Sequence, residues 1–376
     1  MANEAPRSLG AEAEGRGAAV TPRSWPWLGI VFAALVVGAC ASPATQPPAA
    51  ASPAAAPGAA APGATPSPPP IPVRIGYGSI SGNNLGLWIA KDAGYFEQQG
   101  LEVLDFPLIE GGTLSIQSLV AGDIQFVLAG SSGIMAATLR GADLVMVAGA
   151  SNKFDFALMS QANIRTADDL RGGRVGVSRF GSSSDFAART ALQYLGLDPD
   201  RDVVMLQVGG TAARLGAMQS GGLEAAPEIA PATLTARKLG FNIMVDLAEI
   251  GVPYQVGPMS TTRSLVNQNP DAVQRFVRAY LAGIHRLKTD QAFSLQVGRH
   301  YLQTDDPEVL EATWEHFALH SIPEVPYITD ESLAPVLQEL AASDPQAAGA
   351  RLDQFYDNRF LKQAEDSGYV RQLYGR

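Results

Sequence analysis

Cysteine and histidine are scarce in this chain of 376 residues, which has one cysteine, Cys40, and four histidines. A lone cysteine excludes both an intrachain disulfide and a metal site built from cysteines. Two of the histidines, His316 and His320, stand four residues apart and can share a helical face. They lack the H-E-x-x-H order of zinc proteases, and the sequence indicates no third ligand. We therefore expect neither a metal nor a cofactor.

Clustered positive charge is also missing. The chain carries a net charge of −10, and its 27 Lys and Arg residues are scattered along it. Phosphate-binding surfaces need a basic face, so we expect no nucleic-acid partner. Hydrophobic residues make up 46% and charged residues 17% of the chain, as in ordinary globular proteins. At this length the chain can form two lobes with separate cores.

The apolar run at residues 25–39 is short for a membrane span, which needs about 20 residues. Arg7, Arg16 and Arg23 precede it, and a basic segment followed by about 15 apolar residues is typical of a secretory signal. We predict a lipoprotein signal peptide at residues 1–39. A permanent transmembrane anchor is the alternative.

The signal ends in "VGAC" (37–40), which resembles the bacterial lipobox, in which the cysteine thiol is lipidated. No arginine pair supports the twin-arginine route. Residues 40–72 are rich in Pro, Ala, Gly and Ser, so we predict a disordered linker that is partly polyproline II. We expect an extracytoplasmic protein anchored to the membrane through lipid on Cys40, at the periplasmic face or the cell surface.

Strand-like and helix-like segments alternate from residue 73 onward, which predicts βαβ units and largely parallel sheets. The predicted strands of the first run are 73–77, 101–109, 124–129 and 144–150, and a predicted helix covers 85–96. A second run ends near residue 247, and the last third is mostly helical, including residues 351–364. The fold class is therefore α/β.

Three polar stretches follow predicted strand ends and open predicted helices. They are "YGSISGNN" (77–84), "LAGSSG" (128–133) and "SRFGSSSDF" (178–186). Open α/β sheets bind ligands outside the carboxyl ends of their strands, where first-turn N–H groups are unpaired. One serine suffices to cap a helix, so the additional hydroxyls favour a polar ligand. Each serine alone is equally well explained as a cap or turn residue.

Four segments, in this order, resemble the extracytoplasmic solute-binding proteins of ABC importers, in the branch for sulfonates, taurine, nitrate and thiamine-pyrimidine precursors. The segments are "LGLWIAKDAGYFEQQGLEV" (85–103), "SLVAGDIQFVLAG" (118–130), "TADDLRGGRVGVSRFGSSSD" (166–185) and "MQSGGLEAAPEI" (218–229). The resemblance implies a two-lobed, type II periplasmic-binding-protein-like fold with the ligand in the interlobe cleft. Lobe 1 would comprise 73–157 plus about 253–376, and lobe 2 would comprise 158–252. The hinge would lie near 151–159 and 254–260.

The resemblance also places ligand-binding positions in the cleft. They are Ser79, Ser81, Asn83, Asn84, Glu110, Gly130, Ser131, Ser132, Gly181, Ser182, Ser183, Ser184, Pro227 and Met259. The family often has Asp where this chain has Glu224, and the following Pro227-Glu228 is also unusual. We expect Ser184 to cap its helix, while Ser182 and Ser183 donate hydrogen bonds to the ligand and Gly181 lets the backbone approach it.

The sequence leaves the charge of the ligand open. Helix N-termini favour an anion such as a sulfonate or carboxylate, and Arg179 or Arg214 would strengthen that preference if either turned inward. Glu110 favours an amine or a pyrimidine ring with N–H donors instead.

We expect a monomeric substrate-binding lipoprotein that captures a small polar organic solute by closing its lobes and delivers it to the permease and ATPase of an ABC importer. We expect no catalysis, because the cysteine is used for lipidation and no histidine falls in the cleft segments. One alternative is an enzyme on the same fold, of the desulfinase or pyrimidine-synthase kind, with Glu110 as a base. Another is a ligand sensor for a signalling receptor.

Overall fold

The computed structural model describes residues 69–376. The predicted signal peptide, the lipidation site Cys40 and almost all of the predicted linker lie outside these residues, so those three remain predictions. Within the described part, none of the helices combines the length and the apolar character that crossing a membrane requires.

The first sheet has the strand order β2-β1-β3-β12-β4. Strand β1 pairs in parallel with β2 and β3, whereas β12 runs antiparallel to β3 and β4. One reversed strand therefore stands in an otherwise parallel sheet. The strands are β1 (Ile71–Tyr77), β2 (Leu101–Asp105), β3 (Phe126–Leu128), β4 (Leu144–Ala148) and β12 (Met259–Thr262).

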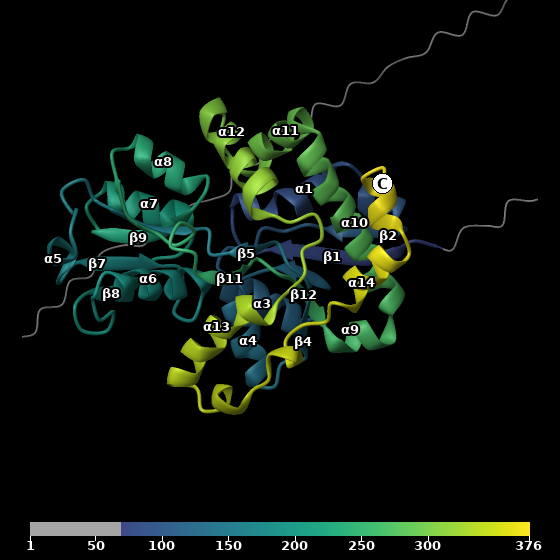
Figure 1. Ribbon diagram of the computed structural model, residues 1–376, viewed down its shortest axis with the longest axis horizontal. Coiled ribbons are helices and arrows are strands. Elements are labelled where there is room, and N and C mark those ends of the chain that lie inside the picture. Colours follow the sequence, from purple (N-terminus) through teal and green to yellow (C-terminus); the bar gives the residue numbers. More distant parts are fainter. Residues whose placement is uncertain (1–68) are drawn as a thin grey trace, which may run out of the picture. The chain divides into compact units, whose positions relative to one another are not determined.

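The second sheet has the order β10-β6-β9-β7-β8 and the same design. Strand β7 pairs in parallel with β8 and β9, and β6 runs antiparallel to β9 and β10. In Figure 1, helices α7 and α8 lie on one side of this sheet and α6 on the other. The strands are β6 (Phe156–Ser160), β7 (Arg174–Val177), β8 (Val204–Gln207), β9 (Ala225–Ile229) and β10 (Asn242–Asp246).

A two-stranded antiparallel ladder joins the sheets. Strands β5 (Ser151–Lys153) and β11 (Pro253–Val256) pair through Lys153 with Pro253 and Ser151 with Val256. The chain passes from β5 into β6 and returns from β11 into β12, so each crossover leads directly into a reversed strand. Within the two five-stranded sheets, the prediction of largely parallel strands is thus confirmed for all strands except β6 and β12.

The helices alternate with the strands up to β10 and then dominate the chain. Those that follow strands of the first sheet are α1 (Leu85–Asp92), α2 (Tyr95–Gln98), α3 (Gly112–Ala121) and α4 (Ser131–Leu139). Those of the second sheet are α5 (Ala167–Leu170), α6 (Ser183–Tyr194), α7 (Thr211–Gln219) and α8 (Ala232–Lys238). The C-terminal helices are α9 (Arg263–Gln268), α10 (Pro270–Thr289), α11 (Gln291–Tyr301), α12 (Pro307–Glu315), α13 (Asp330–Ser343), α14 (Arg359–Asp366) and α15 (Tyr369–Leu373).

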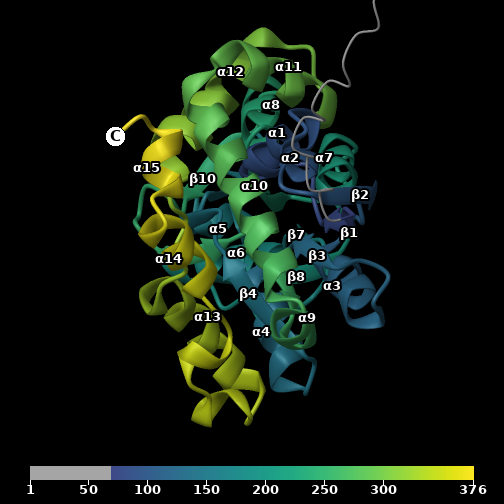
Figure 2. The ribbon, with the colours of Figure 1, turned by 90° about the vertical axis from the view of Figure 1, so that its right-hand side faces the viewer.

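Helix α10 is the central helix of the first-sheet side. Asn269 caps it by accepting a hydrogen bond from the backbone N–H of Ala272 at 3.1 Å, and Pro270 occupies the first turn. It contacts α1 and α2 as well as α14 and α15 (Figure 2). Its Phe276 stacks on Phe126 of β3, with ring centroids 3.9 Å apart. This packing joins the C-terminal helices to the core of the first sheet.

Two predicted helices are interrupted. The segment 85–96 breaks at Gly94, whose φ of 68° lies in the left-handed region that ends helices. The segment 351–364 contains only a short 3₁₀ turn at Leu352–Gln354 before α14 begins at Arg359. Both predictions of a continuous helix were therefore wrong.

Candidate functional site

A cavity of about 370 Å³ is lined by residues that follow strand ends of both sheets. From the first sheet come the segments after β1, β2 and β3, and from the second those after β7, β8 and β9. In each case the lining residues lie where a helix or 3₁₀ turn begins. The cavity is therefore at the carboxyl edge of both sheets, where open α/β folds bind ligands.

Three of these helices begin without a side-chain cap. Gly111, Gly130 and Gly210 are the cap residues of α3, α4 and α7, and none can supply a side-chain acceptor for the first-turn N–H groups. All three glycines line the cavity. First-turn N–H groups and the helix dipoles therefore give the cavity several sites that attract electronegative ligand atoms.

The loop that precedes α1 is held by its own side chains. The Asn84 amide donates hydrogen bonds to the backbone carbonyls of Ser79, at 2.8 Å, and Ser81, at 3.2 Å. The Ser81 hydroxyl donates to the side-chain carbonyl of Asn83. Ser79, Ser81 and Asn83 line the cavity, while Asn84 lies behind them and fixes the loop.

The serine cluster at the start of α6 has a different cap from the predicted one. Ser182 is the cap residue and accepts from the Asp185 N–H at 3.4 Å, so the assignment of the cap to Ser184 was wrong. Ser184 instead accepts from the Ser178 N–H at 2.9 Å. The Ser182 hydroxyl also donates to the Arg179 carbonyl at 2.7 Å, which uses its only proton.

Ser183 is the serine whose proton is free. Its hydroxyl accepts a 3.0 Å hydrogen bond from Tyr254, which leaves its own O–H available to a ligand. Tyr254 is fully buried and stacks on Phe154 with ring centroids 4.1 Å apart. Burial raises the pKa of the Tyr254 hydroxyl, so it stays protonated and remains the donor.

The serine cluster also contacts α4, which belongs to the first-sheet side of the cavity. Ser132 of α4 donates to the Gly181 carbonyl at 3.3 Å. A Cβ atom on Gly130 would stand 2.1 Å from the Ser183 hydroxyl oxygen, so only glycine allows this approach of α4 to α6.

The two charged residues among the described residues that line the cavity are Glu110 and Arg214. Arg214 is paired: its guanidinium contacts both carboxylate oxygens of the fully buried Glu228, at 2.9 and 2.8 Å, and the Gly209 carbonyl at 2.9 Å. Burial raises the pKa of the Glu228 carboxyl, and the two guanidinium contacts oppose that rise. The Arg214 charge is therefore matched within the protein.

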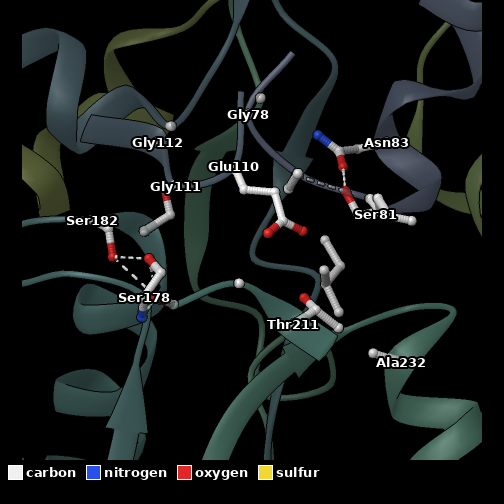
Figure 3. A pocket seen from close by; sticks show the side chains of 18 of the residues that line it. Gly78, Ser81, Asn83, Glu110, Gly111, Gly112, Ser178, Ser182, Thr211 and Ala232 are labelled. Atoms are coloured by element: carbon white, nitrogen blue, oxygen red, sulfur yellow. Dashed lines mark hydrogen bonds between the residues drawn. The ribbon is translucent and has the colours of Figure 1, made fainter. Parts of the chain in front are cut away.

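Glu110 is different, because it makes no hydrogen bond or ion pair with any residue that the structure describes. Its side chain extends into the cavity between the loop of Ser81 and Asn83 and the start of α7 at Thr211 (Figure 3). A Cβ atom on Gly210 would lie 3.1 Å from a carboxylate oxygen of Glu110. The glycine therefore makes room for this carboxylate.

The other acidic and basic positions considered in the sequence lie elsewhere. Glu224 pairs with Arg174 at 2.6 Å, and this contact lowers the pKa of the Glu224 carboxyl. Arg179 is exposed and is absent from the cavity lining. His316 lies 3.0 Å from the Asp155 carboxylate, outside the cavity.

The structure brings nine of the fourteen predicted positions together around the cavity. They are Ser79, Ser81, Asn83, Glu110, Gly130, Ser132, Ser182, Ser183 and Ser184. Five positions are not among the lining residues, namely Asn84, Ser131, Gly181, Pro227 and Met259. Pro227 and Met259 lie within strands, where they pair with Leu158 and Leu128 in the two sheets. Contact with a ligand remains a prediction for all fourteen.

Sequence reasoning missed the lining residues of α7, α8 and the segment after α11. Gly210 and Thr211 follow β8 as a glycine pair and a hydroxyl at a helix start, a signal that resembles the three polar stretches. Leu302, Gln303 and Thr304 come from a helical region far along the chain, where nothing in the sequence indicates a cavity wall.

The family model described as "NMT1/THI5 like" matches residues 81–292, more than half of the chain. The chain belongs to the NMT1/THI5-like family. The match begins in the loop at Ser81 and ends at the start of α11, so it includes all of the cavity lining except Gly78, Ser79, Ile80 and the 302–304 segment.

Proteins similar to this NMT1/THI5-like chain include named binding proteins. The riboflavin-binding protein RibY of Chloroflexus aurantiacus is 28% identical over 216 residues, 56% of this chain and 61% of that protein. The chain thus spans about three fifths of the curated relative it matches. The alkanesulfonate-binding protein SsuA of Xanthomonas axonopodis pv. citri, solved with bound MOPS, is 21% identical with a TM-score of 0.60, covering 76% of this chain and 96% of its own.

The periplasmic nitrate-binding protein NrtA of Synechocystis PCC 6803 has a TM-score of 0.65 at 13% identity, covering 79% of this chain and 89% of its own. These likenesses confirm the predicted α/β fold of the periplasmic binding proteins for this NMT1/THI5-like chain. The match to the family model confirms the predicted family resemblance. The relatives named here are described as binding proteins.

Proposed function

We propose that this protein is the solute-binding component of an ABC importer and captures a small organic solute in the cavity between its two sheets. The observation that supports this most directly is the convergence of six strand ends, three from each sheet, on one cavity. A site that takes half its wall from each sheet is completed only when the two halves approach each other, which is how hinged binding proteins hold a ligand.

The proposed moving parts follow the chain crossings. Lobe 1 comprises 73–157 with about 253–376, and lobe 2 comprises 158–252, with the β5–β11 ladder as the hinge. Hydrogen bonds and ion pairs link the two proposed lobes. The Gly82 N–H donates to the Ala230 carbonyl at 3.0 Å. Lys238 Nζ of α8 lies 2.6 Å from the carboxylate of Asp306, which caps α12, and 2.7 Å from that of Glu308 in the first turn of α12.

We infer binding without catalysis. None of the described residues that line the cavity is a cysteine or histidine, and Arg214 is matched by Glu228. The lining thus offers no nucleophile next to a base. The solute-binding relatives support the same assignment.

The proposed partners are a membrane permease and its ATPase, reached by a monomer tethered through lipid on Cys40. Labelling with radioactive palmitate tests the tether. We expect the label on the parent protein and none on Cys40→Ala; a Cys40→Ala protein that stays in the membrane at normal size would indicate a true transmembrane anchor.

A binding screen tests the central proposal. Thermal melting followed by calorimetric titration would use the purified body with riboflavin, thiamine, taurine, propanesulfonate and nitrate. We expect at least one solute to bind with one-to-one stoichiometry. Failure of a broad screen of small solutes, or binding that survives cavity substitutions at Ser183 and Glu110 together, would contradict the assignment of this cavity.

A further inference from the structure

The charge of the cavity discriminates between the solute classes that the relatives bind. An inorganic anion or sulfonate needs an unmatched positive group, or at least an absence of nearby negative charge. The Arg214 guanidinium is engaged by both oxygens of Glu228, so it contributes little net positive charge. Glu110 is then the unmatched formal charge among the described residues lining the cavity.

Glu110 is exposed to solvent, so its charge acts mainly on groups that contact it directly. Its side chain projects into the cavity toward Thr211, and Ser182 lies on the other side of Gly111 (Figure 3). The uncapped starts of α3, α4 and α7 each offer about half a unit of partial positive charge, whereas Glu110 carries a full charge that no described side chain matches. An anion in direct contact with Glu110 would therefore be repelled, whereas a group that donates a hydrogen bond to this carboxylate would be favoured.

The size and walls of the cavity also argue against a small anion. Its volume of about 370 Å³ is in the range of sites for drug-sized organic ligands, far above what nitrate needs. Apolar side chains make up much of its wall, including Ile80, Ile116, Phe156, Leu215 and Ile229. Such walls suit a ring or hydrocarbon body with a few polar groups.

We propose that Glu110 selects a neutral or cationic organic solute that donates an N–H hydrogen bond to its carboxylate, and that it rejects free nitrate and simple sulfonates. The acceptor groups of the same solute face Ser183 and the uncapped helix starts of α3, α4 and α7. This inference rests on the proposed solute-binding function and names the chemical class of its ligand.

Glu110→Gln tests the selection, because it removes the charge and keeps the shape. The probes are thiamine, a cationic aminopyrimidine, and riboflavin, a neutral ring with an N–H donor, set against nitrate and propanesulfonate. We expect the N–H donors to bind the parent protein and Glu110→Gln to weaken them about 10- to 150-fold. We expect nitrate and propanesulfonate to bind the variant at least as well as the parent.

Glu102→Gln is the matched control, since Glu102 is exposed on β2, outside the cavity. It should leave every dissociation constant unchanged. Gly210→Ala is a second test of the role of Glu110. Alanine can adopt the φ of −64° found at Gly210, so the backbone is not strained. The added methyl group nevertheless forces the Glu110 carboxylate to move. It should weaken N–H donors while leaving the melting temperature nearly unchanged.

Two outcomes separate the failure of this inference from the failure of the proposed function. Tight binding of nitrate or propanesulfonate to the parent protein, unaffected by Glu110→Gln, would overturn the selection by Glu110 and leave solute binding intact. If neither class of probe binds the parent or the variant, the result counts against solute binding in this cavity.

Discussion

The three serines at the start of α6 show how similar residues acquire separate roles from their hydrogen bonds. Ser182 and Ser184 are committed to the turn, because one caps the helix and the other holds the Ser178 N–H. Ser183 is held by Tyr254 and keeps its own proton. The sequence predicted the cluster but not this division, because the division depends on Tyr254, 71 residues further along the chain.

Alanine substitutions separate these roles. Ser182→Ala should lower the free energy of unfolding by about 1 kcal/mol, the usual cost of a lost cap. Ser183→Ala should lower affinity for the bound solute by about 1 kcal/mol, roughly fivefold, because a ligand hydrogen bond is lost. Urea unfolding and calorimetric titration measure the two effects. Equal affinity of Ser183→Ala and the parent protein would remove Ser183 from the site.

Glu339 of α13 should make stability depend on pH. Burial and the nearby Asp185 carboxylate raise its pKa from 4.5 to about 7, although Arg189 opposes the rise. A raised carboxyl pKa means that the folded state keeps a proton that the unfolded chain releases, so stability falls as pH rises from about 4.5 to 7.

Glu339→Gln removes that dependence. The variant should match the parent protein near pH 4 and exceed its free energy of unfolding by about 1 to 3 kcal/mol at pH 8. Urea titrations at both pH values measure this difference, and Glu311→Gln on the exposed face of α12 is the control. A parent and variant with parallel pH profiles would show that Glu339 has no such role.

At the scale of elements, the alternation of strands and helices could be predicted from the sequence. Each segment has the hydrophobic periodicity of a strand or a helix and is bounded by turn residues. The residues at which these elements end were harder to predict. Gly94 breaks the first helix through a left-handed backbone that a helical hydrophobic pattern conceals. The wall at Leu302–Thr304 comes from tertiary packing of the C-terminal helices, which no local pattern encodes.

The approach of α4 to α6 offers a test at this scale. Gly130→Ala should push the two helix starts apart, because the new Cβ atom would fall 2.1 Å from the Ser183 hydroxyl oxygen. We expect solute affinity to fall by about 1–3 kcal/mol, roughly 5- to 150-fold, with a smaller loss of stability. Gly216→Ala is the control, since its added Cβ would meet open space beyond its chain neighbours and the backbone of its own helix. Unchanged affinity in Gly130→Ala would mean that the helix starts need not meet for binding.

At the scale of the whole molecule, the proposed hinge predicts a change of dimensions on binding. Small-angle scattering of the purified body should give a smaller radius of gyration once a bound solute draws the two sheets together. The measurement needs only a saturating solute from the binding screen. A radius that does not change at saturation would argue for a preformed site and against closure.

The β5–β11 ladder also makes the second sheet an insert in the first. The chain leaves the first sheet beside the point where it returns, since Ser151 pairs with Val256 and Lys153 with Pro253. Segments whose two ends lie side by side can be exchanged between homologous proteins with little disturbance of the host. Exchanging residues 156–252 for the corresponding segment of a relative would replace the serine cluster and the Arg214–Glu228 pair while keeping Glu110. Recombination at the ladder can therefore combine the cavity wall of one sheet from one protein with the cavity wall of the other sheet from a relative.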